Sequence, residues 1–192
     1  MFAPRDDAQF GAYFKSNSLS GGERHRLFLR RGGNFKEATL ISGADFREDG
    51  RGFTLFDFDQ DGFMDIGVTS PNHPRFRILK NEIVGERSQQ NGRVAIKLVG
   101  GQTNAEPSDE WSPRDAYGAT ILATVGATQR MFQLSLGEGL SGQNSKYVHV
   151  GLGSAAKIDS VEIHWPSGKI TRETGIPAGQ QVTLYENPAH RE

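Results

Sequence analysis

Hydrophobic and polar residues alternate along this chain in short runs, each bounded by Gly, Pro, Asn or Asp. Such runs are typical of β-strands, and no long segment keeps the period of an amphipathic helix. The predicted strands are 26–30, 52–56, 66–70, 76–80, 94–99, 119–125, 129–136, 147–152, 158–165, 169–171 and 181–185. Only residues 6–14 offer a short helical pattern. The sequence therefore predicts an all-β protein.

The polar stretch 85–92 divides the chain, because its charges and amides have little apolar surface to bury. We place the domain boundary there and predict a β unit over residues 1–88 and a β-sandwich-like domain over residues 89–192. The polar segment 101–114 forms a long loop with an isolated Trp111, which we expect to fold back over the core edge. Trp165, at the end of a predicted strand, is expected to fill the core.

The segment 57–65 reads Asp-Phe-Asp-Gln-Asp-Gly-Phe-Met-Asp, with carboxylates at its first, third, fifth and ninth positions. Calcium takes about 6 to 8 oxygen ligands, and alternate side chains of a tightly curled segment can converge on one ion. The expected ligands are the carboxylates of Asp57, Asp59, Asp61 and Asp65 and the carbonyl of Phe63. Gly62 stands where the chain turns sharply, a position that suits a residue without Cβ. The segment thus predicts a Ca²⁺ site.

An EF-hand shares the Asp-x-Asp-x-Asp-Gly spacing but requires a Glu at position 12 and a helix on each side. Position 12 here is Val68, and both flanks have the β-branched and aromatic residues of strands. The calcium loop is therefore expected to join two strands. A plain solvated turn is the alternative, because Asp and Gly are common turn residues, but turn formation alone does not require four carboxylates at this spacing.

Composition and charge exclude several classes of protein. The 22 basic and 23 acidic side chains leave a net charge of -1, too little to attract nucleic acid or an anionic membrane. No stretch approaches the roughly 20 apolar residues of a membrane span, and the first residues lack the apolar core of a signal peptide. The absence of cysteine excludes disulfides and thiolate metal sites. We therefore expect no nucleic-acid partner and no membrane insertion.

Other motifs do not indicate a catalytic centre. The segments 137–142 and 151–156 match the dinucleotide-binding glycine pattern, but strand patterns follow them instead of helices, so we interpret both as hairpin turns. The five histidines are scattered without the spacing of a zinc site. His149 and His164 alternate with apolar neighbours and are expected on solvated strand faces. No catalytic residue is assigned.

Four blocks in the C-terminal half read Arg-Asp-Ala-Tyr-Gly-Ala (114–119), Gly-Leu-Ser-Gly-Gln-Asn (139–144), Val-Gly-Leu-Gly (150–153) and Val-Glu-Ile-His-Trp-Pro-Ser-Gly (161–168). In this order they resemble the ASPIC/UnbV domain, apart from Val150, which stands where Phe is usual. Residues 26–29, 34–35 and 49–66 resemble an FG-GAP/VCBS-type repeat with its calcium loop. The chain as a whole thus resembles the C-terminal end of a protein of the cartilage acidic protein group.

The resemblance implies that the first domain is one blade of a calcium-bearing β-propeller. A propeller needs about 4 to 8 blades to close its ring, and this chain has one calcium loop. The chain is then a fragment of a longer protein, or its first segment packs on the second domain, or several chains assemble. We favour a two-part chain, because an isolated blade would leave its strand edges and apolar faces unpaired.

The predicted function is a calcium-stabilised binding or scaffolding module, extracellular or periplasmic, whose β-sandwich loops meet a protein or glycan partner. The resemblance to UnbV-type proteins also allows a calcium-assisted enzyme or accessory protein that acts on a small natural-product-like substrate. A third reading is a structural part of a larger β-propeller protein or of a homo-oligomer. Catalysis would need an open coordination position, and four aspartates and a carbonyl nearly fill the coordination sphere, so we expect binding rather than catalysis.

Overall fold

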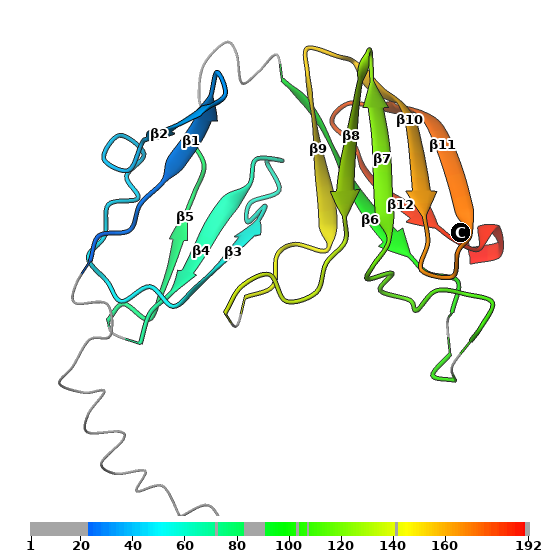
Figure 1. Cartoon of the computed structure of the whole chain (residues 1–192), viewed down its shortest axis with the longest axis horizontal. Coiled ribbons are helices and arrows are strands. Elements are labelled where there is room, and N and C mark those ends of the chain that lie inside the picture. Colours follow the sequence, from blue (N-terminus) through cyan, green and yellow to red (C-terminus); the bar gives the residue numbers. More distant parts are fainter. Residues whose placement is uncertain are drawn as a thin grey trace, which may run out of the picture. The chain divides into compact units, whose positions relative to one another are not determined.

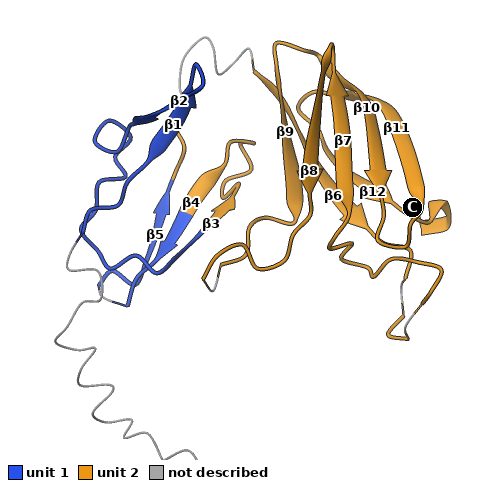
Figure 2. Cartoon of the chain, in the orientation of Figure 1, with its two compact units in different colours: residues 1–53, 67–79 blue, residues 54–66, 80–192 orange. Residues whose placement is uncertain are grey.

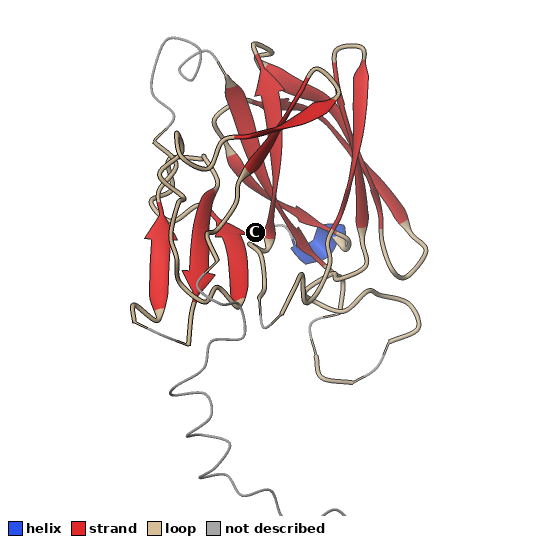
Figure 3. Cartoon of the chain, turned by 60° about the vertical axis from the view of Figure 1, so that its left-hand side comes forward, coloured by secondary structure: helices blue, strands red, loops and turns tan. Residues whose placement is uncertain are grey.

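The computed structural model describes residues 23–71, 73–82, 91–102, 104–106, 108–140 and 142–190. Strands account for 45% of the structure, and the one helix in its described part is the short 3₁₀ turn Pro188–His190 (Figure 3). The prediction of an all-β protein is confirmed. The predicted domain boundary between residues 88 and 89 and the helical pattern at 6–14 lie outside the described residues.

Contacts divide the chain into two units, which Figure 2 distinguishes by colour. Unit 1 comprises residues 1–53 and 67–79, and unit 2 comprises residues 54–66 and 80–192. The predicted calcium loop therefore groups with the C-terminal part of the chain, and its surroundings are those of unit 2.

Unit 2 contains two sheets (Figure 1). The larger sheet has the strand order β11 (Ile170–Pro177), β10 (Lys157–His164), β7 (Thr120–Val125) and β8 (Thr128–Gln133). The smaller sheet has the order β12 (Gln181–Tyr185), β6 (Gly92–Val99) and β9 (Tyr147–Gly153). Neighbouring strands are antiparallel except β12 and β6, which run parallel with Gln181 opposite Ala95. The last strand of the chain thus pairs with the first strand of this sandwich.

The two sheets of unit 2 bury one apolar core. Successive side chains of a strand point to opposite faces, so Val94, Ile96 and Leu98 of β6 all point inward and are at most 3% exposed. Strands β7 and β10 add the buried side chains of Ile121, Ala123, Ile158, Val161 and Ile163. Trp165 follows β10 and is 3% exposed, and its Nε1 donates to Thr171 Oγ1 at 2.8 Å. The prediction that this ring fills the core is confirmed.

Unit 1 is built on a β-hairpin and a three-stranded sheet. Strands β1 (Phe28–Arg31) and β2 (Asn34–Glu37) form the hairpin, and β3 (Gly52–Phe56), β4 (Asp65–Thr69) and β5 (Phe76–Leu79) form the sheet in that order. The ends of β3 and β4 next to the calcium loop belong to unit 2. The loop therefore joins two neighbouring strands, as predicted.

Unit 1 exposes most of the large apolar side chains of its described part to solvent. Those more than a third exposed are Phe28, Leu29, Phe35, Leu40, Ile41, Phe53, Phe76 and Ile78. Among its described residues the buried hydrophobic side chains are those of Ala38 and Ala44. Unit 1 thus has almost no apolar core of its own in the part described.

Most predicted strands differ from the observed ones by one or two residues at an end, and three differences are larger. Strand β2 was not predicted, although Gly32 and Gly33 before it both have positive φ and close a hairpin. Strand β8 ends at Gln133 instead of residue 136, and β11 runs from Ile170 to Pro177 instead of ending at residue 171. The extension of β11 is stabilised by its pairing with β10 from His164 back to Lys157.

Candidate metal centre and the residues around it

The calcium loop holds its curled shape through its own aspartates. The Asp57 Oδ2 accepts from the Gly62 backbone N at 2.8 Å, and the Asp61 Oδ1 accepts from the Phe63 N at 2.8 Å. Short Asp side chains favour such turns because they reach backbone N–H groups a few residues ahead. Gly62 has φ 82°, a left-handed conformation that suits a residue without Cβ. The expectation of a sharp turn at Gly62 is confirmed.

Three of the four predicted carboxylates lie together. Asp57, Asp59 and Asp61 each offer an oxygen, and these oxygens lie within 4.8 Å of one another. Carboxylates this close repel one another unless a cation or a proton intervenes. Oxygen-rich clusters of this kind suit a hard cation such as Ca²⁺.

One oxygen of the cluster supports this interpretation further. The Asp57 Oδ1 is buried and has no hydrogen-bond partner among the described residues. A buried, charged oxygen without a partner costs free energy, whereas coordination to a cation would satisfy it. The donor set and this oxygen therefore fit a bound Ca²⁺, which would supply positive charge and tie the three side chains together.

Lys80 already contributes one positive charge to the cluster. Its Nζ lies 2.7 Å from the Asp59 Oδ2. The hydrogen bond from Lys80 holds the pKa of Asp59 below its usual value, and the same bond raises the pKa of Lys80. Both groups stay charged at neutral pH, so the ammonium competes with a metal ion for this carboxylate.

Asp65, the fourth predicted carboxylate, lies apart from the group of three. It is fully buried, its Oδ2 accepts from the Phe58 N at 2.7 Å, and its Oδ1 accepts from the Asn81 N at 2.7 Å. Both oxygens thus bind backbone N–H groups and hold the base of the loop to the segment after β5. For the Phe63 carbonyl, coordination to the ion stays a prediction.

Arg93 of β6 packs directly on the calcium loop. Its guanidinium carbon lies 4.6 Å from the centre of the Phe63 ring, within the range of a cation–π contact. A Cβ added at Gly62 would lie 1.5 Å from the Arg93 Nε. Gly62 therefore suits this position for its backbone conformation, and any larger residue there would also require the Arg93 side chain to move. Sequence reasoning missed this contact because it depends on how strands distant in sequence pack.

His149 of β9 lines the same cavity of ≈310 Å³ as Asp57 and Arg93. Its Nε2 is buried without a hydrogen-bond partner among the described residues. Burial lowers the pKa of His149, and the nearby Asp57 charge raises it only in part. His149 is thus half-buried, and the expectation that it lies on a solvated strand face holds only in part. His164 does lie partly in solvent, 2.6 Å from the Glu162 Oε1.

Strand β3 attaches the loop to the rest of unit 2. The Leu55 N donates to the Asn144 Oδ1 at 2.8 Å, and the Ser145 N donates to the Leu55 O at 2.9 Å. Thr54 adds a bond from its hydroxyl to the Gln143 carbonyl. The segment 143–145, between β8 and β9, thus runs along β3 just before the calcium loop.

Glu186 is a second buried carboxylate, 2% exposed, at the end of β12. Its oxygens accept from the Gly101 N at 2.7 Å, the Ser112 N at 2.8 Å, the Ser112 Oγ at 3.0 Å and the Ser167 Oγ. Burial alone would raise the pKa of Glu186. The hydrogen bonds lower the pKa by more than burial raises it, so it lies below its usual value. A buried carboxylate is often catalytic, but here its oxygens are engaged, and we assign Glu186 a structural role.

The same carboxylate fixes the long loop that carries Trp111. The Trp111 ring packs so closely on Gly101 that a Cβ there would lie 2.2 Å from the ring, and the Lys169 Nζ lies 3.8 Å from the ring centre. The expectation that Trp111 folds back onto the domain is confirmed. The ring is therefore engaged inside unit 2 and is no open platform for a sugar.

Comparison with known proteins covers the C-terminal part of the chain. The family model described as ASPIC and UnbV matches residues 109–191. All four sequence blocks of the predicted ASPIC/UnbV resemblance lie in this range, so that part of the resemblance is supported. The expected FG-GAP/VCBS repeat finds no such match and stays a prediction. A search of the curated proteins found no match to this chain.

One further observation bears on the membrane. In the described part of the chain, no helix has the length and apolar character needed to span a bilayer.

Proposed function

We propose that this chain is a calcium-stabilised binding or scaffolding module that uses its β-rich surface to hold a protein or glycan partner outside the cell or in the periplasm. The main support for calcium binding is that oxygens of Asp57, Asp59 and Asp61 lie close together. In addition, the Oδ1 of Asp57 is buried without a hydrogen-bond partner among the described residues. These three residues would hold the ion, and its positive charge would offset the repulsion between their carboxylates. The loop then becomes a rigid link between β3 and β4.

Thermal unfolding with and without millimolar calcium tests the ion. At about 100 times its dissociation constant a ligand stabilises the native state by about 2.7 kcal/mol, which corresponds to a rise of about 5 °C or more for a chain of this size. Magnesium is the control, because it demands a smaller octahedral site and retains its waters. Equal shifts with both ions, or no shift with calcium, would contradict the proposal.

Two variants and one control identify the residues responsible. Asp61→Asn should remove most of the calcium-dependent rise, whereas Asp109→Asn, on an exposed loop of the C-terminal part, should leave it unchanged. Lys80→Met should strengthen calcium binding in a calorimetric titration, because it removes the ammonium that competes for Asp59. An unchanged calcium affinity in Lys80→Met would mean that Asp59 does not take part in binding.

A part in a larger β assembly is the second candidate, and one observation favours it. Unit 1 exposes eight large apolar side chains in its described part, where the buried hydrophobic side chains are those of two alanines; a set of this kind is expected where a protein surface binds a partner. Sedimentation velocity over a wide concentration range, in calcium, tests self-association. Concentration-dependent growth that Phe35→Ser and Ile41→Ser suppress would support assembly through unit 1. A monomer at all concentrations would leave a different protein as the partner.

A further inference from the structure

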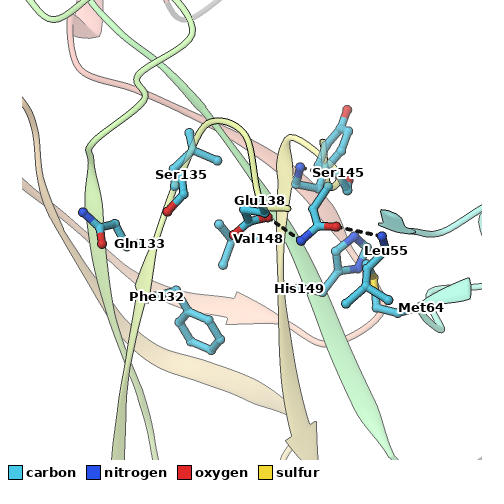
Figure 4. A pocket seen from close by; sticks show the side chains of 12 residues that line it. Leu55, Met64, Phe132, Gln133, Ser135, Glu138, Ser145, Val148 and His149 are labelled. Carbon is cyan, nitrogen blue, oxygen red and sulfur yellow. Dashed lines mark hydrogen bonds between the residues drawn. The ribbon is translucent and has the colours of Figure 1, made fainter. Parts of the chain in front are cut away.

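A second cavity of ≈310 Å³ opens within unit 2, beside the calcium loop. Leu55 of β3 and Met64 line one side, and Phe132 of β8 lines the other, as Figure 4 shows. Its volume lies at the lower end of the range of about 300–1,000 Å³ found for ligand sites. These apolar walls can cover the body of a small ligand.

The polar end of the cavity carries a single acid. Glu138, an exposed residue, is the one carboxylate in its lining; no Lys or Arg lines it, and His149 is its one histidine. The Glu138 Oε2 accepts from the Asn144 Nδ2, and the Asn144 Oδ1 accepts from the Leu55 N at 2.8 Å. The dashed lines in Figure 4 mark these two bonds. Asn144 thus ties the carboxylate to β3, and within the described residues Glu138 has no basic partner.

We propose that this cavity binds an organic ammonium group on an apolar stem, with the cation at Glu138 and the stem against Phe132 and Leu55. A carboxylate attracts an ammonium through a charge-assisted hydrogen bond, and the side chains of Phe132 and Leu55 offer apolar surface to the stem. An anionic ligand would meet the Glu138 charge, and a wholly apolar ligand would remove water from that charge without replacing it. The cavity adjoins the proposed calcium site, because Met64 belongs to the calcium loop and His149 lines both cavities. The proposed ligand is a different one, so the inference goes beyond the function proposed above.

Three probes of one size test the charge preference. Calorimetric titration of the full chain, in millimolar calcium, would use phenethylammonium, 2-phenylethanol and phenylacetate, which share a ring and a two-carbon reach. We expect a dissociation constant of about 1 mM for the ammonium, typical of so small a ligand. The alcohol should bind about fivefold more weakly, and the carboxylate should not bind. An alcohol that binds as tightly as the ammonium would overturn the proposal.

A matched pair of variants locates the preference. Glu138→Gln keeps the shape of the side chain and should weaken the ammonium about fivefold while leaving the alcohol unchanged. Glu110→Gln, an exposed acid in the loop before Trp111, should change neither. Retained alcohol binding in Glu138→Gln shows that the cavity is intact. Unchanged ammonium binding in Glu138→Gln would overturn the assignment.

A wild-type measurement keeps the test independent of any variant. Amide chemical shifts in the presence of phenethylammonium should change at Leu55, Asn144 and Ser145, which form one wall. Changes confined to other parts of the chain would overturn the proposal. Titration with capped lysine distinguishes the two sources of an ammonium group. If capped lysine binds more tightly than phenethylammonium, the site is assigned to a lysine side chain of a partner protein. If it binds more weakly, the site is assigned to a small molecule.

Discussion

The two units of this chain bury apolar side chains to very different extents. In unit 2, inward-facing residues of two sheets form one core, in which Ile121, Val161 and Ile163 are completely buried. In the described part of unit 1 the strands are as regular, yet Phe35 is 70% exposed and Ile41 is 88% exposed. Regular backbone pairing is thus present in both units, but only unit 2 converts it into a packed interior.

The two units therefore differ in what stabilises them: burial of apolar surface in unit 2, and backbone hydrogen bonds and ion pairs in unit 1. Burial of apolar surface contributes about 25 cal/mol per Å², and a fully buried Ile or Leu contributes about 1.5–3 kcal/mol. Unit 2 has these contributions from its own residues. The described residues of unit 1 rely on backbone hydrogen bonds and ion pairs such as Arg77 with Glu48, which stabilise less. We therefore expect unit 1 to gain its remaining stability from what its apolar surface binds.

The largest expected effect on the free energy of unfolding comes from one of two matched isoleucine substitutions. Ile163→Ala should lower the free energy of unfolding by about 3 kcal/mol, because it removes a fully buried side chain and leaves a cavity. Ile41→Ala should change it by less than about 0.5 kcal/mol. Amide hydrogen exchange, read separately in the two units, measures both, because Trp111 and Trp165 both lie in unit 2 and their fluorescence would not follow unit 1. Similar losses from the two variants would mean that Ile41 is buried in solution, for example by a second chain.

The next effect concerns Glu186, a buried carboxylate of unit 2. Glu186→Gln should cost about 2–3 kcal/mol at pH 7, because several buried donors lose a charged acceptor. The folded-state pKa of Glu186 lies below its ordinary value of 4.5. Its contribution is therefore fully present above 4.5 and is lost as the pH falls through the folded-state pKa. The difference between wild type and variant should shrink in that acid range.

Unit 1 provides the control for this carboxylate. Glu48 also has a lowered pKa, owing first to its hydrogen bond with Arg77, but Arg77 is 34% exposed. Glu48→Gln should therefore cost about 1 kcal/mol or less. Amide hydrogen exchange, read separately in the two units, measures both variants. A larger loss for Glu48→Gln than for Glu186→Gln would reverse the ranking of the two units.

The smallest effect compares a glycine from each unit. Gly62 in the calcium loop has φ 82° and faces Arg93, whereas Gly32 in the β1–β2 hairpin has φ 57° with open space around it. Alanine at Gly32 should cost about 1 kcal/mol for the left-handed backbone alone. Alanine at Gly62 should cost about 2 kcal/mol, because the Arg93 side chain must also move.

A double variant isolates the steric part of this difference. Gly62→Ala combined with Arg93→Ala should recover the extra cost relative to Arg93→Ala alone, in a double-mutant cycle measured by thermal unfolding. If the two changes are additive, the contact between Arg93 and Gly62 is absent in solution.

Local patterns were predicted from the sequence more accurately than distant contacts. Strands β3 and β12 were predicted with their observed bounds, because alternation and flanking turn residues define them. Strand β2 was missed because all four of its residues are exposed and show no alternation. Strand β11 was cut short because Gly175 and Pro177 resemble a strand end, although pairing with β10 carries the strand through them.

The candidate metal centre shows the same division. Asp57, Asp59 and Asp61 alternate along one loop, so their convergence follows from local geometry and was predicted. Asp65 belongs to the same pattern, but its oxygens bind the Phe58 and Asn81 backbone instead. Lys80, Arg93 and His149 reach the loop only through strand packing, which residue spacing does not reveal. The calcium ion itself stays a prediction.

The parallel pairing of β12 with β6 has a consequence for biosynthesis. The bond from the Gly101 N to Glu186, just beyond β12, spans 85 residues of the chain. Strand β6 pairs with β9 and with β12. A ribosome releases β12 only after every other strand of the sandwich has emerged. Until then one edge of β6 stays open to pairing with a neighbouring nascent chain. Completion of this sandwich thus waits for its last strand, and closure of so long a loop slows its folding.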